Sequence, residues 1–106
     1  MINRGDLFWL ELPDQKNRPV VIVSPNFLNE VRNRVVVAPC TSRRTNEIAK
    51  TEVLLDTTGL SKQTKVQCQD VGTFQKQHLT DKIRSLTPSE LEALDRALLI
   101  ITGLWN

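Results

Sequence analysis

An arginine and a pair of hydroxyl residues stand at the ends of two apolar, β-branched segments of this chain. Arg18 stands at the start of the first segment, and Thr41 and Ser42 follow the end of the second. If the two segments are neighbouring strands, a guanidinium and a hydroxyl can face the same phosphate. Arginine suits that role because it presents a fixed fork of donors and stays charged at any working pH. The alternative interpretation is two core strands with an ordinary surface arginine and a Thr-Ser turn.

The pattern of apolar residues around these positions predicts many short strands followed by one helix. The expected strands cover residues 7–12, 20–24, 34–39, 51–56, 64–70 and 81–86. A helical turn is expected from Ser24 to Asn29, a loop over residues 41–50, and a bend or bulge at Gly72. This order favours an antiparallel sheet or small barrel with a covering helix, in the α+β, mostly β class.

The clearest local signal is the start of the terminal helix. Thr87, Pro88 and Glu90 fit a capping box with proline at the first helical position. Apolar residues then recur at helical spacing at Leu91, Leu94, Leu98 and Ile101. Gly103 is a natural stop. The segment therefore predicts an amphipathic helix packed on the sheet.

Composition limits the class of protein. A chain of 106 residues with 40% hydrophobic and 25% charged residues predicts a single globular domain over residues 1–106. Residues 1–87 hold 13 Lys and Arg against 9 Asp and Glu, so a modest basic excess lies there. Two cysteines and one histidine do not make a zinc site, so neither metal nor cofactor is expected. The N-terminus lacks an apolar signal region and no segment is long enough to span a bilayer, so we expect a cytoplasmic location.

Several segments, taken in order, resemble the MazF/PemK (Kid) toxins of bacterial type II toxin–antitoxin systems. They are Arg4–Trp9, Arg18–Ser24 (the RPVxxxS strand), Val37–Ser42 (the VAPxTS strand end), Val66–Thr73, His78–Ile83 and the helix Pro88–Gly103. The resemblance implies an SH3-like, partly open barrel and a homodimer. It also implies an mRNA interferase: a metal-independent, sequence-selective endoribonuclease that cleaves single-stranded RNA by 2′-hydroxyl attack. A cognate antitoxin of the MazE/PemI kind is the implied partner.

The resemblance also assigns site residues. In the family, the arginine before proline and the threonine of the TS motif act at the scissile phosphate, which by match are Arg18 and Thr41. Because Arg does not deprotonate, we assign Arg18 to stabilising the phosphorane and Thr41 to orienting the phosphate or the 2′-hydroxyl. Histidine is a residue type that can act as a general base near neutral pH, but His78 lies where the family has no catalytic residue. The RNA-binding candidates are Asn26, Phe27, Ser42, Arg43, Arg44, Gln67, Gln69 and Asp70.

Two departures from the family pattern leave alternatives open. Only Pro13–Asn17 separate the first two strands, where the family often has a longer loop, and the late strand reads Gln69-Asp70 with Gly72 in place of an arginine. One alternative is a CcdB-type gyrase poison, which shares the fold and has an apolar, Trp-containing C-terminus that Trp105 faintly matches. The other is a degenerate barrel that binds a partner without catalysis.

Overall fold

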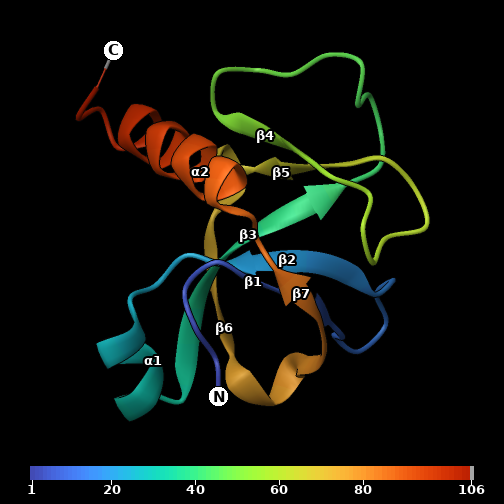
Figure 1. Cartoon of the computed structure of the whole chain (residues 1–106). Helices are drawn as coiled ribbons and strands as arrows, with labels where there is room; N and C mark the ends of the chain where they lie inside the picture. Colours follow the sequence, from blue (N-terminus) through green and yellow to red (C-terminus); the bar gives the residue numbers. More distant parts are fainter. Residues whose placement is uncertain (106) are drawn as a thin grey trace.

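Strand β3 (Arg34–Thr41) organises the sheet of this protein, because three other strands pair with it. The computed structural model describes residues 1–105, which form one curved sheet with a helix across one end (Figure 1). The elements, in chain order, are β1 Asp6–Leu10, β2 Arg18–Ile22, α1 Asn26–Val31, β3 Arg34–Thr41, β4 Glu52–Leu55, β5 Thr64–Gln67, the 3₁₀ helix η1 Cys68–Asp70, β6 Gly72–Gln75, the 3₁₀ helix η2 Lys76–His78, β7 Leu79–Ser85 and α2 Pro88–Ile101.

The sheet is antiparallel and does not close. Its strand order is β4-β5-β3-β2-β1-β7, and β6 pairs with the first half of β3. The last two residues of β3 pair instead with β5, so β3 connects two parts of the sheet. Within residues 1–105, no pairing joins β4 to β7. This arrangement confirms the expected class: a mostly β, antiparallel, partly open barrel with a C-terminal helix.

Side chains alternate between two apolar clusters on the two faces of the sheet. Leu7 and Val21 belong to the cluster that α2 covers, where Leu94 is fully buried. Their neighbours Phe8 and Val20 belong to the cluster on the other face. Period-two alternation in β1 and β2 thus fills both clusters, and it also fixes the face from which each polar residue at a strand end projects.

Helix α2 begins as its sequence predicts. The hydroxyl of Thr87 accepts from the N–H of Glu90 at 3.2 Å, and the Glu90 carboxylate accepts from the N–H of Thr87 at 2.8 Å. Leu91 and Leu98 pack with Leu94 against the sheet. Ile101, expected on the same face, is 37% exposed, so the packed part of the helix ends before it.

Glu90 also connects the helix to the sheet. Arg84, on β7, forms an ion pair with it at 2.7 Å and donates to the carbonyls of Asp56 and Thr58. One guanidinium therefore joins β7, the chain after β4, and the start of α2. This ion pair is distinct from the site described below.

Several expected boundaries are wrong. The strand predicted over residues 64–70 ends at Gln67, because the chain turns into η1, where the N–H of Cys68 donates to the carbonyl of Thr51. Gly72 begins the unpredicted strand β6, where a bend or bulge was expected. The helical turn expected over residues 24–29 begins at Asn26 and continues to Val31. Other strand ends move as follows: β1 ends at Leu10, β2 begins at Arg18, β3 continues to Thr41, β4 covers Glu52–Leu55, and β7 covers Leu79–Ser85.

Two further observations concern the chain as a whole. No helix within residues 1–105 is long and apolar enough to cross a membrane. The expectation of one domain over residues 1–106 remains a prediction, and Asn106 lies outside the described residues.

Candidate active site

Arg18 and Thr41 project from the same face of two paired strands. Val20 pairs with Pro39 in the β2–β3 ladder. Arg18 lies two residues before Val20 and Thr41 two residues after Pro39, so both side chains keep the orientation of that pair. Thr41 in turn pairs with Lys65 of β5. A guanidinium, a hydroxyl and an ammonium therefore arise from one face of three adjacent strands.

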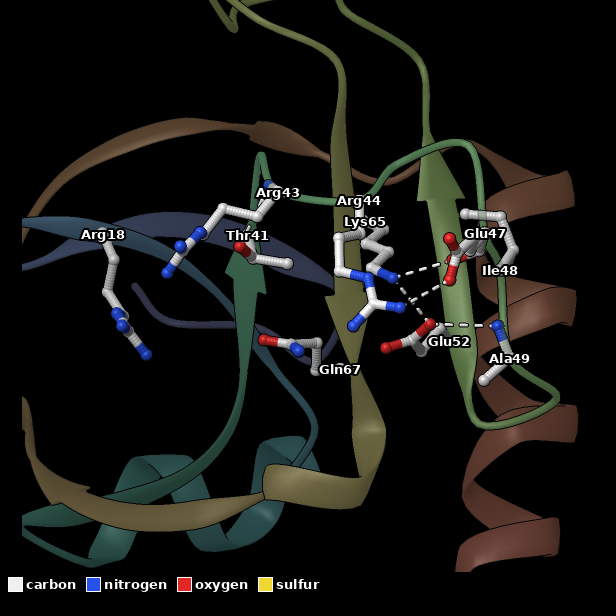
Figure 2. Close-up of a pocket in the computed structure, with 10 residues that line it drawn as sticks. All are labelled: Arg18, Thr41, Arg43, Arg44, Glu47, Ile48, Ala49, Glu52, Lys65 and Gln67. Carbon is white, nitrogen blue, oxygen red and sulfur yellow. Dashed lines mark hydrogen bonds and ion pairs between the residues drawn. The ribbon is translucent and has the colours of Figure 1, made fainter.

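These three residues line one open cavity, called here the main cavity (Figure 2). It measures about 1010 Å³ and is open to solvent. Its lining residues are Arg18, Thr41, Arg43, Arg44, Glu47, Ile48, Ala49, Glu52, Lys65 and Gln67. Four of them are cationic and two are acidic, so the lining has a net positive charge that suits a phosphodiester.

A smaller cavity adjoins the main cavity at Arg18. It measures about 200 Å³, and Arg18 lines both. We call it the Phe74 cavity; its lining residues are Leu10, Leu12, Gln15, Lys16, Arg18, Val20, Pro39, Asp70 and Phe74. An aromatic ring and a carboxylate beside a cationic cavity are groups that can stack on a base and accept hydrogen bonds from its edge.

A second small cavity adjoins the main cavity at Thr41. It measures about 210 Å³ and is called the Trp9 cavity. It is lined by Trp9, Asn17, Pro19, Thr41, Ser42, Leu60, Ser61, Lys62 and Thr64. Arg18 and Thr41 thus each border the main cavity and one smaller cavity.

The carboxyl group of Glu52 in the main cavity is ionised at neutral pH. Burial opposes its ionisation, but hydrogen bonds from the N–H of Ala49, from Gln69 and from Lys65 hold its pKa at about 2. A carboxylate with so low a pKa is a weak base at neutral pH. Glu52 therefore contributes structure to the cavity rather than proton transfer.

The two cysteines near this part of the sheet stay protonated. Burial raises the pKa of the Cys40 thiol well above its ordinary value, and it raises that of Cys68 to about 11. Both thiols are free and buried. Because the thiolate is the reactive form, neither residue is a nucleophile at neutral pH. Within the described residues, no group of three or more His, Cys, Asp and Glu side chains could hold a metal ion.

The structure brings most of the predicted site residues together. Those on the main cavity are Arg18, Thr41, Arg43, Arg44 and Gln67. Asp70 lines the Phe74 cavity and Ser42 lines the Trp9 cavity. Gln69 lines none of the three cavities; its side chain bonds to Thr51 and Glu52.

Two candidates lie elsewhere. Asn26 and Phe27 begin α1 and line none of the three cavities. The side-chain oxygen of Asn26 accepts from the N–H of Arg4 at 2.7 Å, which is a structural contact. Phe27 is 69% exposed, so it is free to contact another molecule but does not belong to the cavity lining.

The sequence did not reveal the acidic and lysine residues of the main cavity. Lys65 alternates in the sequence with the apolar residues of its strand, yet it is only 6% exposed. Leu54 pairs with Lys65, which places Glu52 diagonally across the β4–β5 hairpin. Opposite charges at diagonal positions of two predicted strands are the signal that could have found this pair, once the hairpin register was known.

Comparison with known proteins identifies the family. The model of the PemK-like, MazF-like toxins of type II toxin–antitoxin systems matches residues 3–102. The chain belongs to the PemK/MazF toxin family. The Arg18 and Thr41 motifs lie inside the matched region, and the gyrase-poison alternative is not favoured.

Similar PemK/MazF proteins cover all or most of the chain. It is 30% identical to Endoribonuclease MazF9 of Mycobacterium tuberculosis, with 100% of each protein covered. A mycobacterial endoribonuclease in complex with its cognate antitoxin superposes with a TM-score of 0.86 at 26% identity, with 100% of each chain covered. The Mycobacterium tuberculosis toxin MazF-mt6 has a TM-score of 0.81 at 27% identity, with 92% of this chain and 96% of that chain covered.

Proposed function

We propose that this toxin is an endoribonuclease that cuts single-stranded RNA without a metal ion, with Arg18 and Thr41 at the scissile phosphate. The observation that carries the proposal is the position of these two residues on one face of paired strands, where both line a cationic cavity. The similarity to mycobacterial endoribonucleases over the whole chain supports the same activity.

The proposed reaction uses the nucleophile that RNA carries. The 2′-hydroxyl loses its proton and its oxygen bonds to the adjacent phosphorus, while the bond from phosphorus to the 5′-oxygen breaks and the leaving 5′-oxygen gains a proton. The products are a 2′,3′-cyclic phosphate and a free 5′-hydroxyl. The protein must hold the attacking and leaving oxygens in line and stabilise the charge that grows on the phosphate.

Arg18 and Thr41 divide these tasks. Arg18 stays protonated, so it donates to the non-bridging oxygens of the phosphorane rather than removing a proton. The hydroxyl of Thr41 accepts from the N–H of Arg43 at 3.1 Å, which leaves its own proton free to donate to the phosphate. Arg43 and Arg44, beside them, contact the phosphates of neighbouring nucleotides.

An antitoxin and a second copy of the chain are the proposed protein partners. One similar structure is an endoribonuclease in complex with its cognate antitoxin. The basic excess of residues 1–87 suits an acidic, partly disordered partner that folds on binding. The exposed apolar side chains of Phe27 and Val31 on α1 suit burial in a homodimer. We place these events in the cytoplasm, where RNA and antitoxin are both present.

The decisive test is cleavage of a long single-stranded RNA in the presence of EDTA. Discrete cuts that end in cyclic phosphates are expected for the wild-type protein, and Arg18→Ala should lose them. Arg34→Ala is the matched control, because Arg34 is an exposed arginine at the opposite end of β3 and should leave cleavage intact. Uncut RNA with inhibited DNA supercoiling would support the gyrase poison; uncut RNA without that inhibition would support the binding module.

A further inference from the structure

We propose that Lys65 and Glu52 are positioning residues that hold the 42–51 loop, between β3 and β4, in the conformation that binds RNA. This inference rests on the proposed function, because the loop carries Arg43 and Arg44 along the main cavity. Neither Lys65 nor Glu52 needs to touch the RNA. Their role is to present the two arginines beside Thr41.

The ammonium of Lys65 joins the loop to the sheet. Its Nζ donates to Oε1 of Glu52 at 2.9 Å and to the main-chain carbonyl of Glu47 at 2.8 Å (Figure 2). Glu47 lies in the middle of the loop, whereas Lys65 lies in β5 and pairs with Thr41 of β3. One buried side chain therefore connects the strand residue next to Thr41 with the far side of the loop.

The Glu52 carboxylate fixes the end of the same loop. Its Oε1 also accepts from the N–H of Ala49 at 2.9 Å, and its Oε2 accepts from the amide of Gln69 at 2.9 Å. The other side of that amide, Oε1 of Gln69, accepts from the hydroxyl of Thr51 at 2.9 Å. Lys65, Glu52 and Gln69 thus form an anchor, held to β5 and η1, that bonds the loop at three points.

The loop needs such an anchor because its own conformation is unfavourable. Arg44 has a φ of 53°, in the left-handed region that costs a non-glycine residue energy. Its guanidinium is held by an exposed ion pair with Glu47 at 2.9 Å, which contributes little to stability. The contacts from Lys65 to Glu47 and from Glu52 to Ala49 flank Arg44 on its C-terminal side, and the Thr41–Arg43 bond precedes it.

Because the Lys65–Glu52 ion pair is buried, its effect on the position of the loop can be separated from its effect on the free energy of unfolding. The side chains of Lys65 and Glu52 are each 7% exposed. Removing one partner leaves a buried charge without its counterion, which destabilises the fold strongly, whereas replacing both with apolar residues of similar size is often neutral. A double substitution can therefore keep the fold while it removes the anchor.

The experiment compares Lys65→Met, Glu52→Met and the double variant in the full-length protein. Each is measured for unfolding free energy, for kcat and KM with a single-stranded RNA, and for hydrogen exchange of the loop amides. The double variant should recover stability relative to the single variants. Its KM should stay raised by about tenfold, because the two arginines must now be ordered on binding, while kcat stays within about twofold. The loop amides should exchange faster than in the wild type.

Arg84→Met with Glu90→Met is the matched control. That ion pair has similar burial, at 13% and 7% exposed, but neither residue lines the main cavity. It should change stability without raising KM or exposing the loop amides. A Lys65/Glu52 double variant with wild-type KM and wild-type loop exchange would overturn the proposal.

The two proposals fail in different ways. If the wild-type protein does not cut RNA, the proposed function is wrong. The dissociation constant for uncut RNA is then measured in place of KM. Faster loop exchange with weaker RNA binding in the double variant would then still support the anchor. Unchanged exchange or unchanged binding would contradict it.

Discussion

The hydroxyl of Thr41 accepts a hydrogen bond from the backbone N–H of Arg43 at 3.1 Å. This contact joins the last residue of β3 to the first basic residue of the 42–51 loop. Because the hydroxyl oxygen is the acceptor in this bond, the hydroxyl proton is available to donate to a bound phosphate. The geometry gives separate expectations for the two parts of the side chain, the hydroxyl and the methyl group.

Thr41→Val should abolish most cleavage while the protein stays folded. Valine keeps the shape and the β-branching but loses both the acceptor for the Arg43 N–H and the donor to the phosphate. Loss of one preorganised donor costs about 10²-fold in kcat. Thr41→Ser keeps the hydroxyl and should retain most activity. Single-turnover cleavage of a short RNA measures both; equal activity in the valine and serine variants would remove Thr41 from the mechanism.

Arg18→Lys should be nearly as defective as Arg18→Ala. Lysine keeps the charge but loses the planar fork that fits two phosphate oxygens at once. We expect a loss of about 10²-fold or more in kcat for either variant, with the unfolding free energy unchanged, because Arg18 is exposed at the first position of β2. Cleavage rates and denaturant unfolding of the three proteins test this. A lysine variant with wild-type activity would show that charge alone is sufficient.

Arg43 and Arg44 should supply affinity for the RNA backbone rather than base selectivity. Replacing Arg43 with Gln and Arg44 with Asn removes both charges, and asparagine tolerates the positive φ at position 44. Binding should weaken for all sequences, and the slope of log affinity against log salt should fall by about 0.7 for each lost contact. Titration of RNA at several salt concentrations gives the slope. A loss confined to one sequence would instead identify these arginines as base-reading residues.

The short connection between β1 and β2 should relax sequence selectivity. Few residues are available there to cover the main cavity and to reach base edges, although Gln15 and Lys16 line the Phe74 cavity. Each bidentate base contact contributes about 1–3 kcal/mol of discrimination, by analogy with DNA. We therefore expect a short or degenerate cleavage consensus. Mapping of 5′ ends across a transcript pool measures it, and a strict consensus of about five bases or more would place the reading residues elsewhere.

Acid should destabilise the protein through Glu90. Burial opposes ionisation of this carboxyl, but Arg84 and the N–H groups of Thr87 and Asp56 lower its pKa from 4.5 to about 2. Because the folded-state pKa is the lower one, the stabilisation is complete above pH 4.5 and is lost as the pH falls towards 2. The contribution at neutral pH is about 3 kcal/mol. Denaturant unfolding of wild type and Glu90→Gln at neutral pH and at about pH 3 should show a difference that shrinks in acid; a constant difference would contradict this role.

The fold was predictable wherever local pattern and local chemistry agree. The capping box at Thr87 and the apolar spacing around Leu94 are local signals, and α2 begins and packs as they indicate. The turn of η1 is not local, since it depends on a bond from Cys68 to the carbonyl of Thr51. Strand β6 is short, and its pairing partner β3 is distant in the sequence, so its alternation was too brief to predict.

The same difference between local signals and long-range contacts explains which site residues could be predicted. Arg18 and Thr41 lie at strand ends that contain proline, and such strand ends can be recognised in a single sequence. The Lys65–Glu52 pair depends on the register of the β4–β5 hairpin, which decides whether a lysine on an alternating strand faces solvent or a carboxylate. Asp70 reaches the Phe74 cavity because η1 turns the chain there, not through a bulge at Gly72. The sequence could not provide the register of strands that are distant in the chain, because residue types do not encode that register locally.

Three strands pair with β3, so β3 cannot detach without breaking most of the sheet. Thr41 ends this strand, and the residues directly after it belong to a loop that contains one strained backbone position. Opening of the loop alone therefore costs far less free energy than opening of β3, which approaches the free energy of global unfolding. A toxin built this way can admit and release a long, irregular polymer by local fluctuation while Thr41 stays in place. We therefore expect the boundary between its most stable and its more labile cooperative units between residues 41 and 42.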